Sequence, residues 1–198
     1  MNRPAARVPL VNAANILTAL RLVLVPGFAV AVVVSGLTHS GWRIAAAAIF
    51  LAASLTDFVD GWIARRYGLI TAFGKIADPI ADKALTGTAL ILLSGYGALP
   101  WWVTVVILGR ELAITLLRFW VIRYGVIAAS RAGKWKTGLQ IAAISWYVLF
   151  APAAGGDWAA PGLLAIVGPW LMGVTVAVTV VTGLDYVVRA WRLRTASP

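Results

Sequence analysis

The stretch from Asp57 to Asp82 reads DFVDGWIARRYGLITAFGKIADPIAD and is the most informative part of the chain. It holds four of the seven acidic residues in the sequence, namely Asp57, Asp60, Asp78 and Asp82. Long apolar runs flank it, so the first pair ends one hydrophobic segment and the second pair begins the next. Ionisable residues within or beside membrane spans are costly and usually functional. The stretch therefore predicts a polar site where two membrane helices meet.

The composition supports a membrane protein. The 198 residues have a mean hydropathy of +0.88, and only 12% are charged, which is far too apolar for a soluble domain of this size. Cysteine is absent, so disulfides and thiolate metal sites are excluded. The net charge of +10 comes from basic residues at the ends of apolar runs. These positions fit topology signals and anionic lipid contacts, and nucleic acid is not expected as a partner.

Hydropathy predicts an all-α integral membrane protein with six transmembrane helices in a single domain, residues 1–198. The predicted spans are about Ile16–Val34, Trp42–Ala64, Pro79–Gly95, Trp101–Tyr124, Thr137–Ala153 and Leu163–Val188. The segment from Arg3 to Leu10 has the character of a short interfacial helix.

The basic residues predict the orientation. Of those near the span ends, Arg43 alone lies on the side of the connections after spans one, three and five. The opposite side holds Arg3, Arg7, Arg65, Arg66, Lys75, Arg123, Arg131, Lys134, Lys136, Arg189, Arg192 and Arg194. By the positive-inside rule, both termini are cytoplasmic and the chain is a multi-pass protein of the cell membrane.

Helix geometry places the acids of each pair on one face. At 100° per residue, Asp57 and Asp60 fall with Gly61 and Arg65 within an arc of about 140°. The second pair is separated by only about 40°. Two such pairs on antiparallel neighbours can surround a common point. Because four carboxylates would repel one another there, a cation is expected between them.

Hard oxygen ligands without histidine or cysteine favour Mg²⁺, Mn²⁺ or Ca²⁺ over zinc. Gly61 leaves room for a phosphate beside Asp60, and Arg65 can bind a phosphate through two parallel hydrogen bonds. Single residues also allow structural roles. Asp78 before Pro79 is a typical helix N-cap, and Arg65 can anchor its helix at the membrane surface.

The full pattern resembles the signature of the CDP-alcohol phosphotransferase family. It reads Asp57-x2-Asp60-Gly61-x2-Ala64-Arg65-x8-Gly74-x3-Asp78-x3-Asp82. The resemblance implies six transmembrane helices around a polar cavity open to the cytoplasm, and a homodimer. It also implies that the four aspartates hold two Mg²⁺ or Mn²⁺ ions and that Asp82 is the general base. The CDP-diacylglycerol site would include Gly61, Arg65, Thr71 and Gly74.

Other motifs resemble bacterial phosphatidylglycerophosphate synthases. These are Asn12-x2-Asn15-Ile16-Leu17-Thr18-x2-Arg21-x4-Pro26, Gly109-Arg110-Glu111-Leu112 with Arg118, and Ala128-Ala129-Ser130-x2-Gly133-Lys134-x-Lys136-Thr137-x2-Gln140. They imply glycerol 3-phosphate as the acceptor. Asn15, Thr18 and Arg21 are candidates for binding CDP-diacylglycerol, with helix capping and anchoring as the alternative.

Arg110, Arg118, Lys134 and Lys136 are the candidates for the acceptor phosphate. Buried arginines in a span need anionic partners, and a phosphorylated acceptor would supply that charge. Pairing of Arg110 with Glu111 or Asp185, and anchoring by the two lysines, are the alternatives. Lys83 points about 100° away from Asp82 and is a weaker candidate.

Other functions remain open from the sequence. The same chemistry with inositol 1-phosphate would also satisfy a basic pocket, whereas phosphatidylglycerol would make the chain a cardiolipin synthase. A divalent-cation transporter would explain the aspartates but not Gly61 and Arg65. A non-catalytic scaffold predicts that Asp82→Asn has no effect.

Overall fold

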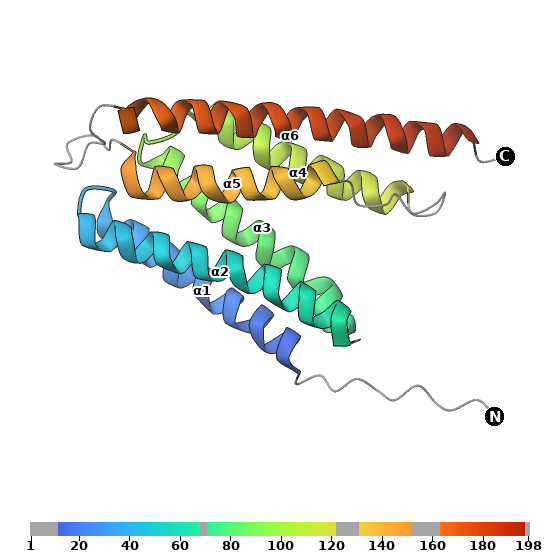
Figure 1. Cartoon of the computed structure of the whole chain (residues 1–198), viewed down its shortest axis with the longest axis horizontal. Coiled ribbons are helices and arrows are strands. Elements are labelled where there is room, and N and C mark those ends of the chain that lie inside the picture. The colour runs from blue at the N-terminus through green and yellow to red at the C-terminus, as the bar shows by residue number, and fades with distance from the viewer. Residues whose placement is uncertain (1–11, 68–70, 122–130, 152–162, 197–198) are drawn as a thin grey trace.

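A computed structural model describes residues 12–67, 71–121, 131–151 and 163–196, and within these ranges the chain is helical without strands. The helices are α1 (Ala13–Ser35), α2 (Ser40–Tyr67), α3 (Ala72–Gly95), α4 (Trp101–Val121), α5 (Arg131–Phe150) and α6 (Leu163–Ala196). In Figure 1, α1 and α2 form one layer, α4, α5 and α6 form another, and α3 crosses obliquely between them.

The α1–α2 hairpin is defined by local signals at both ends of α1. The side chain of Asn12 accepts a hydrogen bond from the backbone N–H of Asn15 at 3.0 Å, as an N-cap does. Gly36 ends α1 with a left-handed φ of 52°, and its N–H bonds back to Val32 and Val33. Glycine adopts this conformation at little cost, which lets the chain reverse into α2.

Aromatic and small residues pack the bundle. The rings of Phe28 and Phe50, both buried, lie 5.5 Å apart between α1 and α2. On the other side, Gly168 of α6 lies against the Trp146 ring of α5, where a Cβ would come within 2.1 Å of a ring carbon. A side chain at this position would therefore force α5 and α6 apart.

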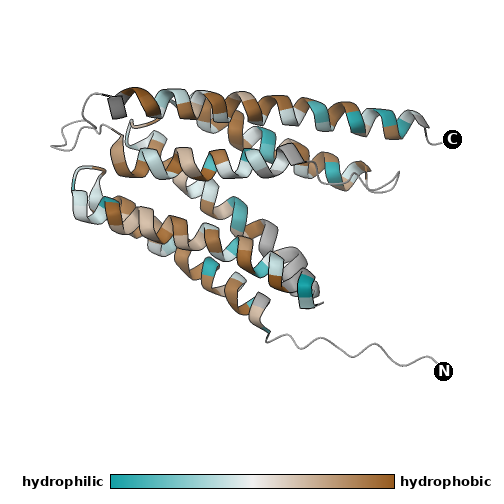
Figure 2. Ribbon diagram, viewed as in Figure 1, coloured by the Kyte–Doolittle hydropathy of each residue, from teal (hydrophilic) through white to brown (hydrophobic). Residues whose placement is uncertain are grey.

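Hydrophobic residues predominate along the helices, as the brown ribbon in Figure 2 shows. Large exposed hydrophobic residues include Val23, Phe58, Val105 and Leu184, a pattern that fits contact with lipid rather than water. Three segments of the described helices are long and apolar enough to cross a membrane: Asn15–Ser35, Ser40–Ile63 and Ile166–Thr195.

Several helices extend beyond their predicted spans. α3 begins at Ala72 rather than near Pro79, so Asp78 lies inside the helix and its interpretation as an N-cap is wrong. α5 begins at Arg131, and α6 continues to Ala196. Hydropathy locates only the apolar part of a helix, and polar or charged residues can continue it. The segment Arg3–Leu10 lies outside the described residues.

Candidate active site

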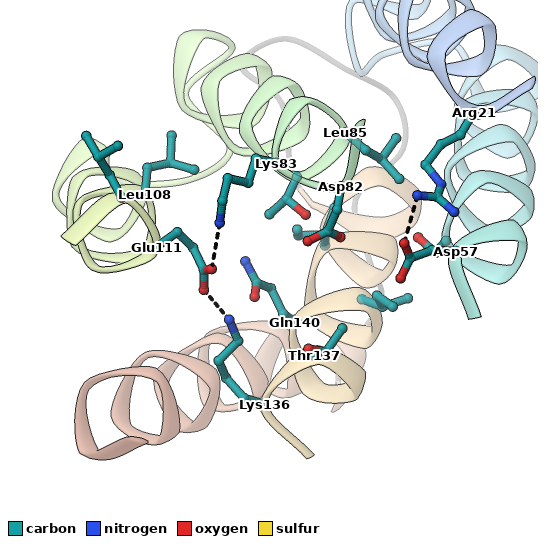
Figure 3. A pocket seen from close by; sticks show the side chains of 15 residues that line it. Arg21, Asp57, Asp82, Lys83, Leu85, Leu108, Glu111, Lys136, Thr137 and Gln140 are labelled. Carbon is teal, nitrogen blue, oxygen red and sulfur yellow. Dashed lines mark hydrogen bonds and ion pairs between the residues drawn. The ribbon is translucent and has the colours of Figure 1, made fainter. Parts of the chain in front are cut away.

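A cavity of about 260 Å³ opens between α1, α2, α3, α4 and α5. It is lined by Arg21, Ser54, Asp57, Asp82, Lys83, Leu85, Thr86, Leu108, Glu111, Leu112, Lys136, Thr137, Gln140, Ile141 and Ile144. In Figure 3, Asp82 lies between the Arg21–Asp57 pair on one side and the Glu111–Lys136 pair on the other. The charged residues thus form two groups. We call them the acidic pole (Asp57, Asp60 and Asp82 with Arg21) and the basic pole (Lys83, Arg110 and Lys136 with Glu111).

At the acidic pole, Arg21 of α1 bridges two aspartates of α2. Its Nη1 lies 2.7 Å from Asp57 Oδ1, and its Nη2 donates to Asp60 Oδ2 at 2.6 Å. The hydroxyl of Thr18 also contacts Asp60 Oδ2, at 3.4 Å. Asp60 is 3% exposed and lies behind the arginine, whereas the side chain of Asp57 is 41% exposed and reaches the cavity. The spacing that put both acids on one helix face thus brings them to a single cation.

The start of α3 is tied to α1 beside this pole. Thr71, the residue before α3, donates its hydroxyl hydrogen to Asn15 Oδ1 at 2.9 Å, and both side chains are buried. Asn15, Thr18 and Arg21 therefore face α2 and the α3 start, not lipid. Their contacts fit both the predicted substrate role and a structural one.

Asp82 lies near the middle of α3, and its side chain lines the cavity. With Asp57 it presents two carboxylates to the same space. No group of three acids or histidines near enough to share a metal ion occurs among the side chains that the structure describes. The side chain of Asp78, the fourth predicted ligand, is not among them.

At the basic pole, three cations converge on Glu111 of α4. Its Oε1 accepts hydrogen bonds from Lys136 of α5 and from Arg110 Nη1 at 3.2 Å. Its Oε2 lies 3.6 Å from Lys83 Nζ of α3. Lys136 is buried, and Lys83 and Glu111 also line the cavity. Lys83, expected to be a weaker candidate, thus belongs to this group.

Arg110 and Arg118, predicted to bind the acceptor phosphate, do not line the cavity. Arg110 reaches α6, where Nε donates to the carbonyl of Thr179 at 3.1 Å and Nη2 donates to Thr182 Oγ1 at 3.1 Å. Its contact with the cavity residues is its ion pair with Glu111, which the sequence analysis gave as the alternative to phosphate binding. Arg118 is exposed. Their roles as phosphate ligands remain predictions.

Other predicted residues are placed only by their backbone. Gly61 follows Asp60 in α2, and Arg65, Gly74, Asp78 and Lys134 lie within α2, α3 and α5. The side chains of Arg65, Asp78 and Lys134 lie outside the described part of the structure, and the roles of all five residues remain predictions.

Several polar residues line the cavity without having been predicted as ligands: Ser54, Thr86, Glu111, Thr137 and Gln140. Gln140 is 6% exposed, and its Nε2 has no hydrogen-bond partner among the described residues. For Glu111 a signal was present, because an ionisable residue inside a predicted span is usually functional.

The fold and the site define a class of membrane enzyme. Residues 11–181 match the family model described as CDP-alcohol phosphatidyltransferase, so the chain belongs to that family. It is therefore a multi-pass membrane enzyme, and members of the family generally depend on metal ions.

Three similar proteins come from bacteria. A "Probable phosphatidylglycerophosphate synthase" of Mycobacterium tuberculosis (strain CDC 1551 / Oshkosh) is 51% identical over 188 residues, which cover 95% of this chain and 86% of that protein. A "CDP-diacylglycerol--glycerol-3-phosphate 3-phosphatidyltransferase" of Escherichia coli (strain K12) is 36% identical over 81% of this chain and 91% of that protein. A Bacillus subtilis (strain 168) protein with the same description is 46% identical over 54% of this chain and 56% of its own length.

Proposed function

We propose that this chain transfers the phosphatidyl group of CDP-diacylglycerol to glycerol 3-phosphate, giving phosphatidylglycerophosphate and CMP. The observation that carries the proposal is the division of one cavity into an acidic and a basic pole. The acidic pole suits a metal-bound diphosphate, and the basic pole suits a phosphorylated acceptor. Similarity to relatives described by this activity supports the choice.

The acidic pole has the chemistry of a magnesium or manganese site. Its three aspartates offer the carboxylate oxygens that these ions prefer as ligands. Asp57 and Asp60 already share one positive charge, that of Arg21. We expect two Mg²⁺ or Mn²⁺ ions to be held by Asp57, Asp60, Asp78 and Asp82. When bound, these ions would neutralise the diphosphate and stabilise the negative charge on departing CMP.

Direct attack by the acceptor accounts for the bond changes. Asp82 takes the proton from the acceptor hydroxyl, whose oxygen forms a new bond to the phosphorus that carries diacylglycerol. The bond from that phosphorus to the bridging oxygen breaks, and its electrons leave with CMP. The position of Asp82 between the Arg21–Asp57 pair and the Glu111–Lys136 pair supports this role, since a base must reach the hydroxyl of an acceptor whose phosphate is held elsewhere.

The remaining groups bind and orient the two substrates. Arg21, Asn15, Thr18 and Thr71 support the acidic pole, with Gly61, Arg65 and Gly74 expected along the CDP moiety. Lys136 is the best-placed ligand for the acceptor phosphate because it is buried and lines the cavity. Lys134, Arg110 and Arg118 are expected to add positive charge around it.

The proposal includes an arrangement in the membrane. All six helices are expected to span it as one domain, with both termini and the cavity on the cytoplasmic side, because the basic residues concentrate at that end. We expect a homodimer, which light scattering on the purified protein in detergent would detect.

An acceptor screen tests the function. Purified protein receives CDP-diacylglycerol, Mg²⁺ or Mn²⁺, and in separate reactions glycerol 3-phosphate, inositol 1-phosphate or phosphatidylglycerol, and CMP release is followed. We expect glycerol 3-phosphate to give the fastest release. Preference for another acceptor would overturn the substrate assignment but leave the reaction class intact.

A further inference from the structure

Glu111 is the one acid among the residues of the basic pole, and its position is unusual for a site that binds an anion. Its carboxylate accepts hydrogen bonds from Lys136 and Arg110 and lies 3.6 Å from Lys83. The three cations come from three helices, α3, α4 and α5. Lys83 and Lys136 also line the cavity. Glu111 therefore occupies the positive groups that a phosphate entering the cavity would need.

The cations do not depend on Glu111 alone for their positions. Arg110 is held by the carbonyl of Thr179 and the hydroxyl of Thr182 on α6. It crosses α6 at Gly183, where a Cβ would lie 3.1 Å from the Cγ and Nε atoms of Arg110. Lys136 is 8% exposed, so its side chain stays buried beside the cavity. Loss of the carboxylate charge would therefore leave Arg110 held by α6 and Lys136 still buried beside the cavity, with Lys83 nearby on α3.

We infer that Glu111 is an internal competitor for the acceptor phosphate, and that it thereby sets the affinity and specificity of the basic pole. This inference rests on the proposed function for the identity of the acceptor. One carboxylate carries a single negative charge, whereas a phosphate monoester carries close to two near neutral pH. The monoester can therefore displace Glu111 from the lysines, and an uncharged alcohol cannot.

This competition has two consequences for the enzyme. Acceptors without a phosphate monoester are disfavoured, because they would leave the Glu111 contacts in place and gain none of their own. Product release is also assisted, because the carboxylate returns to the lysines as the phosphate departs. If Glu111 instead only positions the lysines, its removal would weaken phosphate binding. The two roles therefore predict opposite changes in phosphate affinity when the Glu111 carboxylate is removed.

The test compares Glu111→Gln with the wild-type protein. The glutamine keeps the size of the side chain but removes its charge. The matched control is Asp185→Asn, which removes one negative charge from α6, where Asp185 pairs with Arg189 at 2.9 Å away from the cavity. Two quantities are measured: the KM for glycerol 3-phosphate at saturating CDP-diacylglycerol, and the thermal stabilisation by inorganic phosphate without CDP-lipid.

We expect Glu111→Gln to lower the KM for glycerol 3-phosphate about tenfold and to bind inorganic phosphate about tenfold more tightly, with the control unchanged. Glu111→Asp, whose carboxylate is one methylene shorter, should shift both values in the same direction by less. This variant decides the question if the glutamine variant does not fold. An unchanged or weaker affinity for phosphate would overturn the inference.

Failure of the inference and failure of the proposed function are distinguishable. Inorganic phosphate binding is measured without turnover, so it reports on Glu111 whichever alcohol is the acceptor. The proposed function fails if the wild-type protein does not release CMP with glycerol 3-phosphate or releases it faster with another acceptor.

Discussion

Arg21 and Arg43 are both fully buried arginines of the α1–α2 hairpin, at 0% and 1% exposure, but their partners differ completely. Arg21 bridges two carboxylates beside the cavity. Arg43 lies near the opposite end of the hairpin and donates only to backbone carbonyls, those of Leu37, Tyr147, Val148 and Ala151 at 2.8–3.2 Å.

The difference separates a functional charge from a structural one. Arg43 joins the α1–α2 connection to the last turn of α5, where unpaired helix carbonyls and the helix dipole favour a cation. All three of its guanidinium nitrogens are engaged by carbonyls, and it does not line the cavity. Arg21 is held by acids that a ligand can use, and one of them is open to the cavity. Substitutions at the cavity end of the hairpin should therefore mainly lower turnover, whereas substitution of Arg43 should mainly lower stability.

The largest effect on turnover is expected at the cavity end for Asp82→Asn. The amide cannot take the acceptor proton, and such a loss typically costs about 10²–10⁴-fold in rate. Binding of CDP-diacylglycerol should persist, because the other aspartates remain. Single-turnover CMP release and a lipid-binding assay measure the two quantities. Full activity of the variant would refute the base role, and Asp185→Asn is the charge control.

Arg21→Met should lower turnover by about a hundredfold and leave Asp57 and Asp60 without their shared cation. Breaking a buried ion pair by removing one partner costs about 3 kcal/mol or more. Divalent metal should restore part of that stability, because it supplies the missing positive charge. The measurement is thermal unfolding with and without Mg²⁺. A metal-induced stabilisation no greater than that of the wild-type protein would contradict the proposed metal site.

A smaller effect is expected for Arg110→Ala, which acts on the basic pole through Glu111. We expect about a tenfold rise in the KM for glycerol 3-phosphate, with kcat changed little, since a lost charge-assisted hydrogen bond costs about 1.5–3 kcal/mol. Arg110→Lys should rescue only partly, because one ammonium cannot reproduce the fork that reaches both Glu111 and α6. A fall in kcat without a change in KM would place Arg110 outside acceptor binding.

The smallest effect on turnover is expected for Arg43→Met at the hairpin end. Activity per folded molecule should stay within about twofold of wild type, whereas the free energy of unfolding should fall by about 3 kcal/mol or more. The reason is that each buried carbonyl left unbonded costs about 1–3 kcal/mol. Thermal unfolding and the specific activity of the folded fraction give the comparison. A large loss of activity in folded protein would remove the distinction between the two arginines.

Sequence reasoning predicted some features because they are local. The three-residue spacing of Asp57 and Asp60 puts them on one face of α2, and both form ion pairs with Arg21. The partner itself could not be derived, because Arg21 lies 39 residues before Asp60 and helix periodicity does not say which helices pack together.

Other features depended on the shape of the assembled bundle. On an isolated helix Lys83 points about 100° away from Asp82, but in the bundle its long side chain lines the cavity and its Nζ lies 3.6 Å from Glu111 of α4. The early start of α3 was missed because hydropathy does not detect the polar part of a helix. The structural role of Arg43 depends on carbonyls from α5, more than a hundred residues away.

The most direct measurement on the division of the cavity is the effect of Lys136→Met on the KM of each substrate. We expect the KM for glycerol 3-phosphate to rise at least about tenfold, a loss of about 1.4 kcal/mol, while the KM for CDP-diacylglycerol stays within about twofold. An unchanged KM for glycerol 3-phosphate together with a raised KM for CDP-diacylglycerol would contradict it, because the basic pole would then bind the donor instead of the acceptor.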